Sequence, residues 1–227
     1  MFPIHIVTDK RRFETTADKV FCVLTPEQRQ AYLDENLVLK ERTYPLQFGQ
    51  SEYKIICPEI QDKKNLDADK YIIIPEFLIP RRPYPIYVYI YGMVLYSSNP
   101  KMGQREAAEK TRKRFGLTTF SHTTLGRAMK KLEALIKTNE NKPERDNEAK
   151  ESQKPGTRCF PTVELTRKRK GTVLSYLQEA SGQDSHLIQE PSHPQLNFNR
   201  PPYNGAFIDV CHRIVEYTHK KYCKLLL

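Results

Sequence analysis

Three segments of the chain place apolar residues at the spacing of an α-helix and predict amphipathic helices. The first two, residues 103–115 and 121–137, are joined by a connection that begins with Gly116 and Leu117, and the third occupies residues 206–227. Their apolar stripes are Ala107, Ala108, Thr111 and Phe115 in the first, Leu125, Ala128, Met129, Leu132 and Ile136 in the second, and Phe207, Val210, Cys211, Ile214, Val215, Thr218, Tyr222 and Leu225 in the third. Ser121 is a favourable N-cap for the second helix.

Two shorter helices are indicated elsewhere. Thr25 as a cap, Pro26 at the first helical position and Glu27 in the first turn predict a helix that runs towards Asn36. A further short helix is expected over residues 172–180.

The region between these helices mixes strand and helix signals. Two β-branched runs, residues 53–58 and 70–75, end at prolines and enclose the polar stretch 61–69, so they predict a hairpin with a long solvated loop. Three prolines make residues 79–85 irregular. In the apolar segment 86–96 that follows, alternating β-branched and aromatic residues favour a strand, whereas length and all-round apolarity favour a buried helix.

The expected fold is mainly α with a small β-hairpin, built on a helix-turn-helix core and a C-terminal helix. Residues 138–158 contain two prolines and almost no apolar side chain, which predicts a flexible linker. It separates an α+β region at 1–80 and a helix-turn-helix region at 81–137 from a helical region at 159–227. We expect the stripe in 206–227 to dock on the rest of the fold, on a second copy in a homodimer, or on a protein partner.

Positive charge is concentrated in the middle of the chain. The net charge is +10, and residues 81–172 hold 21 Lys and Arg against 9 Asp and Glu, a local balance of +12. The remaining residues hold 16 and 18, a balance of −2. A concentrated positive field attracts polyanions and releases their counterions on binding, so nucleic acid is the expected partner.

The lengths of the apolar runs and the spacing of the cysteines indicate the cellular compartment and the redox state that we expect for the protein. No apolar run is long enough to span a bilayer, and the charged first dozen residues do not form a secretory signal, so we expect a cytoplasmic protein that does not bind membranes. The five cysteines are an odd number at scattered spacings without a C-x-x-C pair, which argues against a disulfide framework. They are Cys22, Cys57, Cys159, Cys211 and Cys223.

Two helices joined by a short connection, the second with a basic outer face, form the arrangement that reads a DNA major groove. Arg127 in the leading half of the second helix offers a bidentate fork to guanine. The candidates for contact with bases and nearby phosphates are Ser121, His122, Thr123, Thr124 and Arg127. The candidates for sequence-independent attraction to phosphates are Arg105, Lys110, Arg112, Lys113, Arg114, Lys130 and Lys131.

Several short motifs resemble bacterial transposase-like proteins, specifically an uncharacterised family related to insertion-sequence transposases. The matching pieces are the stretches Ile73–Pro80, Arg82–Tyr84, Gln104–Ala108, Ser121–Arg127 and Phe207–Cys211. The resemblance covers about two thirds of the chain. It implies a zinc-ribbon-like hairpin, a buried helix and a helix-turn-helix in that order, and it therefore favours a helix over residues 86–96.

The chain departs from this family in two places. The family's ribbon uses paired cysteines, whereas here Cys22 is followed three positions later by Thr25, and Cys57 by Ile60. One thiol remains at each position, so a zinc site with four thiolate ligands cannot form, although a residual site of Cys22 and Cys57 completed by a histidine stays open. We expect no cofactor. The connection between the two helices is also longer than the tight turn of compact repressors.

We expect a sequence-specific DNA-binding protein of mobile-element origin, an accessory factor or regulator without a catalytic domain. Strand transfer needs three carboxylates on a ribonuclease-H-like sheet, and the residues after Leu135 do not predict one. Two alternatives stay open. One is a protein–protein adaptor, and the other is an RNA-binding protein in which interleaved Tyr and Arg, such as Arg82, Tyr84, Tyr87 and Tyr89, stack on unpaired bases.

Overall fold

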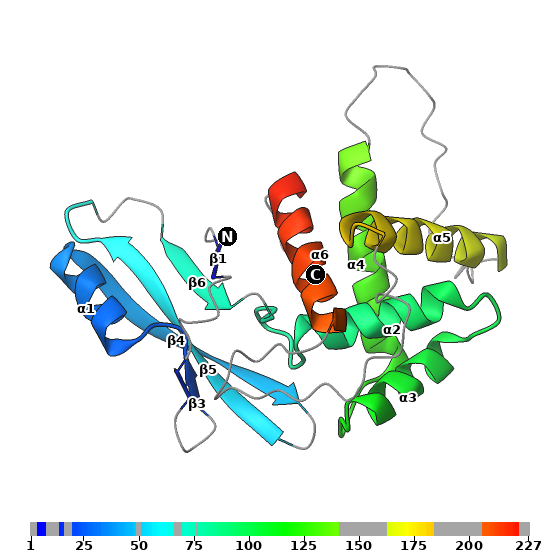
Figure 1. The fold of residues 1–227 in the computed structure, drawn as a ribbon, viewed down its shortest axis with the longest axis horizontal. Coiled ribbons are helices and arrows are strands. Elements are labelled where there is room, and N and C mark those ends of the chain that lie inside the picture. Colours follow the sequence, from blue (N-terminus) through cyan, green and yellow to red (C-terminus); the bar gives the residue numbers. More distant parts are fainter. Residues whose placement is uncertain are drawn as a thin grey trace, which may run out of the picture.

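Helix α2 (Ile86–Ser98) lies in the middle of the chain's computed structural model (Figure 1). The structure describes residues 4–7, 14–15, 20–48, 51–65, 70–75, 77–140, 163–183 and 206–222. Eleven of the thirteen residues of α2 are buried. Because a helix that is apolar on every side is stable only when protein surrounds it, burial outweighs the strand propensity of its β-branched and aromatic residues. The helix expected over residues 86–96 is confirmed.

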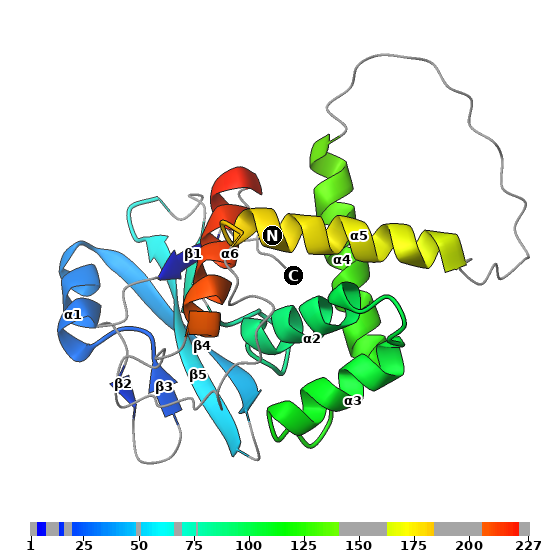
Figure 2. The ribbon, with the colours of Figure 1, turned by 45° about the vertical axis from the view of Figure 1, so that its right-hand side comes forward.

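Four further helices surround α2. They are α3 (Gln104–Arg114), α4 (His122–Glu140), α5 (Val163–Ala180) and α6 (Ala206–Tyr222). Helix α2 contacts all four, α3 packs on α4, and α5 packs on both α4 and α6. Figure 2 shows α5 crossing α4, with α6 between this group and the sheet.

The predicted helices are confirmed with small shifts at their ends. Helices α3 and α4 lie within a few residues of the segments that the apolar spacing indicated. Helix α5 begins at Val163, nine residues before the expected start, so the basic cluster 166–170 is helical. The expected linker begins inside α4, which continues to Glu140, and residues 141–158 lie outside the described part of the chain.

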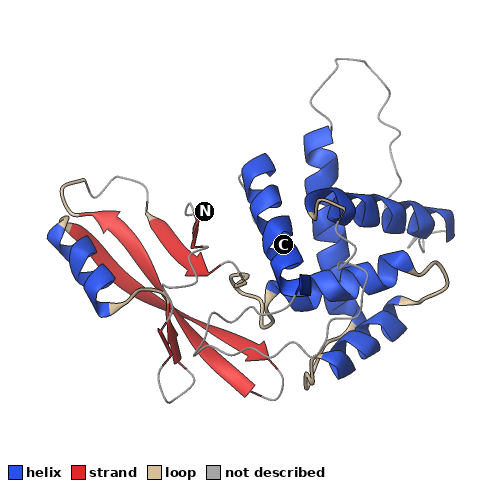
Figure 3. Ribbon diagram, viewed as in Figure 1, coloured by secondary structure: helices blue, strands red, loops and turns tan. Residues whose placement is uncertain are grey.

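The strands form a mixed sheet on the side of the molecule opposite the group of helices α2 to α6 (Figure 3). They are β1 (Ile4–Val7), β2 (Glu14–Thr15), β3 (Val20–Cys22), β4 (Leu37–Phe48), β5 (Ser51–Asp62) and β6 (Tyr71–Pro75). Strand β5 is central: it pairs antiparallel with β4 along its whole length and, on its other edge, antiparallel with β6 and parallel with β3. Strand β1 adds parallel to β6, and β2 antiparallel to β3.

The predicted hairpin is present as β5 and β6, with Glu59 opposite Ile72. The mainly α fold class with a small sheet is therefore confirmed, although the sheet contains more strands than one hairpin. Among the described strands, β4 pairs with β5 alone. This edge position tolerates Pro45, which lacks the amide that a central strand requires.

Helix α1 (Pro26–Asp34) packs beside β4, on the side of the sheet away from the other helices (Figure 1). Its start agrees with the sequence: the Thr25 hydroxyl accepts from the amide of Gln28 at 3.3 Å, and the Gln28 side chain accepts from the amide of Thr25 at 3.1 Å. This reciprocal pair is a capping box, and Pro26 occupies the first turn. The helix ends at Asp34, two residues before the expected end.

Candidate nucleic-acid interface

The connection from α3 to α4 is held at its first end by a C-cap. Gly116 has a φ of 58°, a left-handed conformation that glycine adopts without steric cost. The amide of Leu117 donates to the carbonyl of Arg112 at 3.0 Å, and the amide of Gly116 donates to the carbonyl of Lys113 at 3.3 Å. This pair of bonds is a Schellman motif, and Leu117 is buried beside it.

Aromatic packing holds the second end of the connection. Phe120 is buried, and its ring lies edge-on to Tyr84 and Tyr89, with centroids 5.4 and 5.8 Å away. The Tyr84 hydroxyl also contacts the hydroxyl of Thr119 at 2.7 Å. The longer connection is therefore an ordered turn that fixes α4 against α2.

The first turn of α4 begins with the predicted cap. The Ser121 hydroxyl accepts from the amide of Thr124 at 3.2 Å, and it lies 2.7 Å from the Thr123 hydroxyl and 3.0 Å from the Thr124 hydroxyl. Ser121 and Thr123 are exposed, whereas His122 and Thr124 are half-buried. Three hydroxyl groups are thus gathered at the start of the helix, where backbone amides point outwards and favour anions.

The rest of α4 separates apolar from cationic residues as the sequence predicts. The whole predicted stripe from Leu125 to Ile136 is buried, and Arg127, Lys130 and Lys131 are exposed on the outer side. Partial burial and the nearby charge of Arg82 lower the pKa of Lys131. The charge of Arg82 therefore acts on Lys131, a relation that sequence reasoning missed because no local pattern connects two residues almost fifty positions apart.

Three acidic residues of the two helices, Glu106, Glu109 and Glu133, are already in ion pairs. Within α3, Lys110 lies 3.0 Å from Glu106 and Lys113 lies 2.8 Å from Glu109. In α4, Glu133 binds Lys137 at 2.9 Å. Six of the predicted cations have no ion pair with any residue that the structure describes, namely Arg105, Arg112, Arg114, Arg127, Lys130 and Lys131. Arg105, Arg127, Lys130 and Lys131 are exposed, whereas Arg112 and Arg114 are half-buried and the Nε of Arg114 is buried. The two helices thus carry a net excess of positive charge, and four of these cations are open to solvent.

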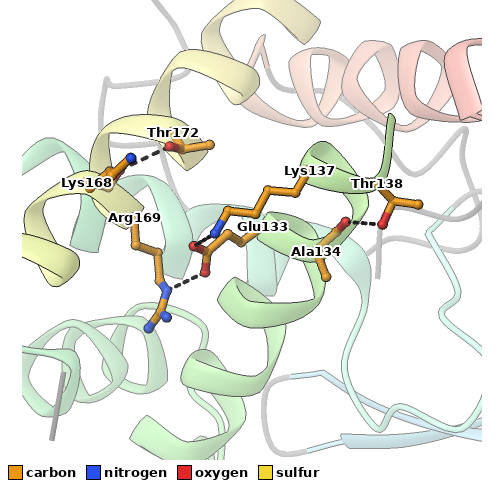
Figure 4. Close-up of polar contacts among 7 residues, drawn as sticks. All are labelled: Glu133, Ala134, Lys137, Thr138, Lys168, Arg169 and Thr172. Atoms are coloured by element: carbon orange, nitrogen blue, oxygen red, sulfur yellow. Dashed lines mark hydrogen bonds and ion pairs between the residues drawn. The ribbon is translucent and has the colours of Figure 1, made fainter. Parts of the chain in front are cut away.

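In helix α5, part of the basic cluster 166–170 contacts the rest of the protein and is not directed to solvent. The Arg169 side chain pairs with Glu133 at 2.5 Å, so Glu133 is shared between α5 and Lys137 (Figure 4). Lys170 is buried, and its Nζ donates to the carbonyls of Asn99, Pro100 and Met102 at 2.8 to 3.3 Å. Of this cluster, Arg167 and Lys168 are exposed.

The two cysteines of the residual metal site do not converge. Cys22 in β3 is in register with Ile56 in β5, so these two side chains share a face of the sheet. Cys57 is the next residue in β5 and points to the opposite face, where it is fully buried. The site left open by the sequence is therefore absent, and no cluster of three His, Cys, Asp or Glu residues able to hold a metal exists in the described ranges.

Two further observations narrow the possible partners. Tyr84, Tyr87 and Tyr89 are each at most 4% exposed, so their rings belong to the core and do not stack on unpaired bases. The described part of the α6 stripe is buried from Val210 to Thr218, against α5 and α2, whereas Tyr222 is half-buried and Leu225 lies outside the described residues. A partner that binds residues 206–222 would therefore contact the outer face of this helix.

None of the helices in the described residues combines the length and apolarity that crossing a lipid bilayer requires.

No family model, curated protein or solved structure matches the chain. The resemblance to transposase-like proteins stays a prediction, and the function has to be inferred from the cations of α3 and α4.

Proposed function

We propose that this protein binds double-stranded DNA sequence-specifically, with α4 as the recognition helix. The observation that carries the proposal is the set of six cations on α3 and α4 without an ion pair in the described residues. Such cations gain most from a polyanion, because DNA phosphates release condensed counterions when Lys and Arg neutralise them.

The geometry of the two helices supports duplex DNA as the polyanion. A helix with one exposed face, a capped and hydroxyl-rich start and an Arg in its second turn has the dimensions and donors that a major groove accepts. The RNA alternative loses its stacking residues, because the tyrosines are buried. We place the biological role with accessory factors or regulators of mobile elements, in line with the sequence resemblance, and the proposed activity requires no catalytic group.

The test is a titration of labelled duplex DNA with the full chain at 50 and 200 mM salt. If about five of the six cations contact phosphates, the slope of log K against log salt is roughly −4 to −5, and affinity falls by about 500-fold between these concentrations. Absence of duplex binding would favour the adaptor, and tighter binding to single-stranded RNA would favour the RNA alternative.

Single substitutions separate base reading from phosphate binding. Arg127→Ala should reduce the preference for the best duplex over a scrambled one by about tenfold, because a bidentate contact to guanine is lost. Lys130→Ala should weaken all duplexes alike and make the salt slope smaller by about 0.9. Lys40→Ala is the matched control, because Lys40 is an exposed cation on β4 whose removal changes the net charge equally.

Lys113→Ala should have a smaller effect than Lys130→Ala. The sequence assigns both lysines to phosphate binding, but Lys113 is paired with Glu109 and its charge is partly offset. If the Lys40 variant weakens binding as much as the Lys130 variant, net charge alone explains the affinity and α4 is not the recognition helix.

A further inference from the structure

Helix α1 packs beside β4 but buries none of its own residues. A helix that packs on a sheet normally buries an apolar stripe. Leu33 of α1 is instead 37% exposed, more than any other large apolar side chain in the described part of the chain. In and beside the sheet, Cys22, Leu39 and Ile56 are only half-buried. Helix α1 therefore covers this face of the sheet loosely.

A cavity of about 360 Å³ lies between α1 and the sheet. Cys22 in β3 is in register with Ile56, and Glu41 in β4 with Pro58, so one face of β3, β5 and β4 forms a wall of the cavity. The larger apolar residues of its lining are Val23, Leu24, Leu33, Leu39 and Ile56. Small-molecule sites in proteins have this range of volume and a similar, mainly apolar lining.

Two charged side chains of the lining form an ion pair at the rim of the cavity. The Nη2 atom of Arg29 lies 3.1 Å from the Oε1 atom of Glu41, and the two side chains are 53% and 46% exposed. Because their charges offset each other, the rim favours neither an anion nor a cation. A guanidinium has several N–H donors and a carboxylate has several acceptor sites, so the pair can still form a hydrogen bond with a neutral group.

The volume of the cavity limits what can bind. It corresponds to the space of about twelve water molecules in the liquid. A helix of a partner protein, which is about 10 Å wide with its side chains, is too large. A compact molecule with two rings or a short hydrocarbon chain has a suitable size. Its apolar part would shield Leu33, Leu39 and Ile56 from water, which favours binding.

We propose that the cavity between α1 and the sheet binds a small, uncharged and largely apolar molecule. The ligand carries one hydrogen-bonding group, which Arg29 or Glu41 recognises at the rim. Helix α1 lies on the side of the sheet away from α3 and α4 (Figure 1), so this site is separate from the proposed DNA-binding surface. The inference does not rest on the proposed DNA-binding function.

The test uses phenylnaphthylamine, an uncharged aromatic probe with one N–H group whose fluorescence rises in apolar surroundings. Titration of the full chain should show saturable binding of one probe per chain. Leu33→Gln replaces an apolar part of the wall by an amide and should weaken binding about fivefold. Ala31→Gln is the matched control, because Ala31 is exposed on α1 and does not line the cavity, and it should leave the affinity unchanged.

Protection of Cys22 shows where the probe binds. Because Cys22 lines the cavity, saturating probe should slow its reaction with iodoacetamide several-fold, measured by peptide mass spectrometry of the full chain. Anilinonaphthalene sulfonate has the same rings with an added negative charge. It should protect Cys22 only at a higher concentration than the uncharged probe, because Glu41 already offsets the charge of Arg29.

Saturable binding that Leu33→Gln weakens, together with protection of Cys22, would support the site. The inference is overturned if the probe does not bind saturably. It is also overturned if binding leaves Cys22 unprotected, or if Ala31→Gln and Leu33→Gln have equal effects, because the probe would then bind elsewhere. Protection of Cys22 by the sulfonate at a lower concentration than by the uncharged probe would show that the assignment of an uncharged ligand is wrong.

Discussion

At the scale of single residues, Lys170 fastens α5 to the turn between α2 and α3. Its ammonium group donates to three backbone carbonyls and lies 4.1 Å from the centre of the Tyr96 ring. Lys170→Met keeps the length of the side chain but removes the donor. We expect a loss of about 2 kcal/mol in the free energy of unfolding, because carbonyls at a half-buried turn lose a charged partner.

The measurement is urea denaturation followed by circular dichroism. Lys168→Met is the control, since Lys168 is exposed two positions earlier in the same helix, and it should change stability by less than about 0.5 kcal/mol. Equal losses in the two variants would show that Lys170 adds no more than an exposed lysine.

The sequence predicted the role of a single residue correctly where its hydrogen-bond partner lies only a few positions away in the chain. Ser121 as a cap needs only the amide of Thr124, three positions later, and the capping box at Thr25 is equally local. Lys170 could not be recognised in this way, because its partners lie about seventy positions earlier and a run of basic residues is typical of a solvated face. The separation of Cys22 from Cys57 likewise depends on strand register, which the sequence does not reveal.

At the scale of elements, Gly92 sets how closely α2 approaches its neighbours. A Cβ at this position would lie 3.1 Å from the Thr111 hydroxyl and 3.2 Å from a Leu125 methyl group, and both side chains are fully buried. Gly92→Ala should therefore destabilise the protein by about 1–3 kcal/mol, although alanine favours helices.

Gly171 in α5 is the matched position for this substitution. A Cβ there meets nothing within 4 Å. Gly171→Ala should stabilise the protein by about 1 kcal/mol, because only the helix propensity changes. Thermal unfolding of both variants gives the comparison. A gain in stability for Gly92→Ala would mean that the side chains of Thr111 and Leu125 move aside at little cost in free energy.

Element predictions depended on whether one pattern dominated the segment. Helices α3 and α4 have clear apolar stripes, and their positions followed directly. The sequence did not predict strand β4, which contains Pro45, a residue that is acceptable in a strand at the edge of a sheet. Helix α2 needed the family resemblance, since a helix buried on all sides has no polar face to indicate its period.

At the scale of the whole molecule, α2 connects parts of the chain that the sequence treats as separate regions. Its buried side chains belong to one hydrophobic cluster that extends from the sheet to α5 and α6. The C-terminal helices α5 and α6 therefore pack on the same core as α3 and α4. The sequence had suggested that a linker at residues 138–158 separates these two regions. Helix α4 consequently packs on α2 and α3 and, from the C-terminal part of the chain, on α5.

This shared core predicts that the sheet and the C-terminal helix unfold together, and two cysteines report on the two parts. Cys57 in β5 and Cys211 in α6 are each at most 1% exposed, and burial raises the pKa of both thiols, so neither forms a reactive thiolate in the folded protein. In variants that keep one of them and replace the other cysteines by alanine, labelling should begin only when the chain unfolds.

The measurement is the fraction of thiol labelled in a short pulse at increasing urea concentrations. Both variants should give midpoints that agree with the loss of helical circular dichroism of the same variant, as expected for a single cooperative transition. Labelling of Cys211 at a lower urea concentration than Cys57 would contradict this, because α6 would then detach while the sheet stays folded. In that case α6 would stabilise α2 only weakly, and removing it would leave α3 and α4 intact.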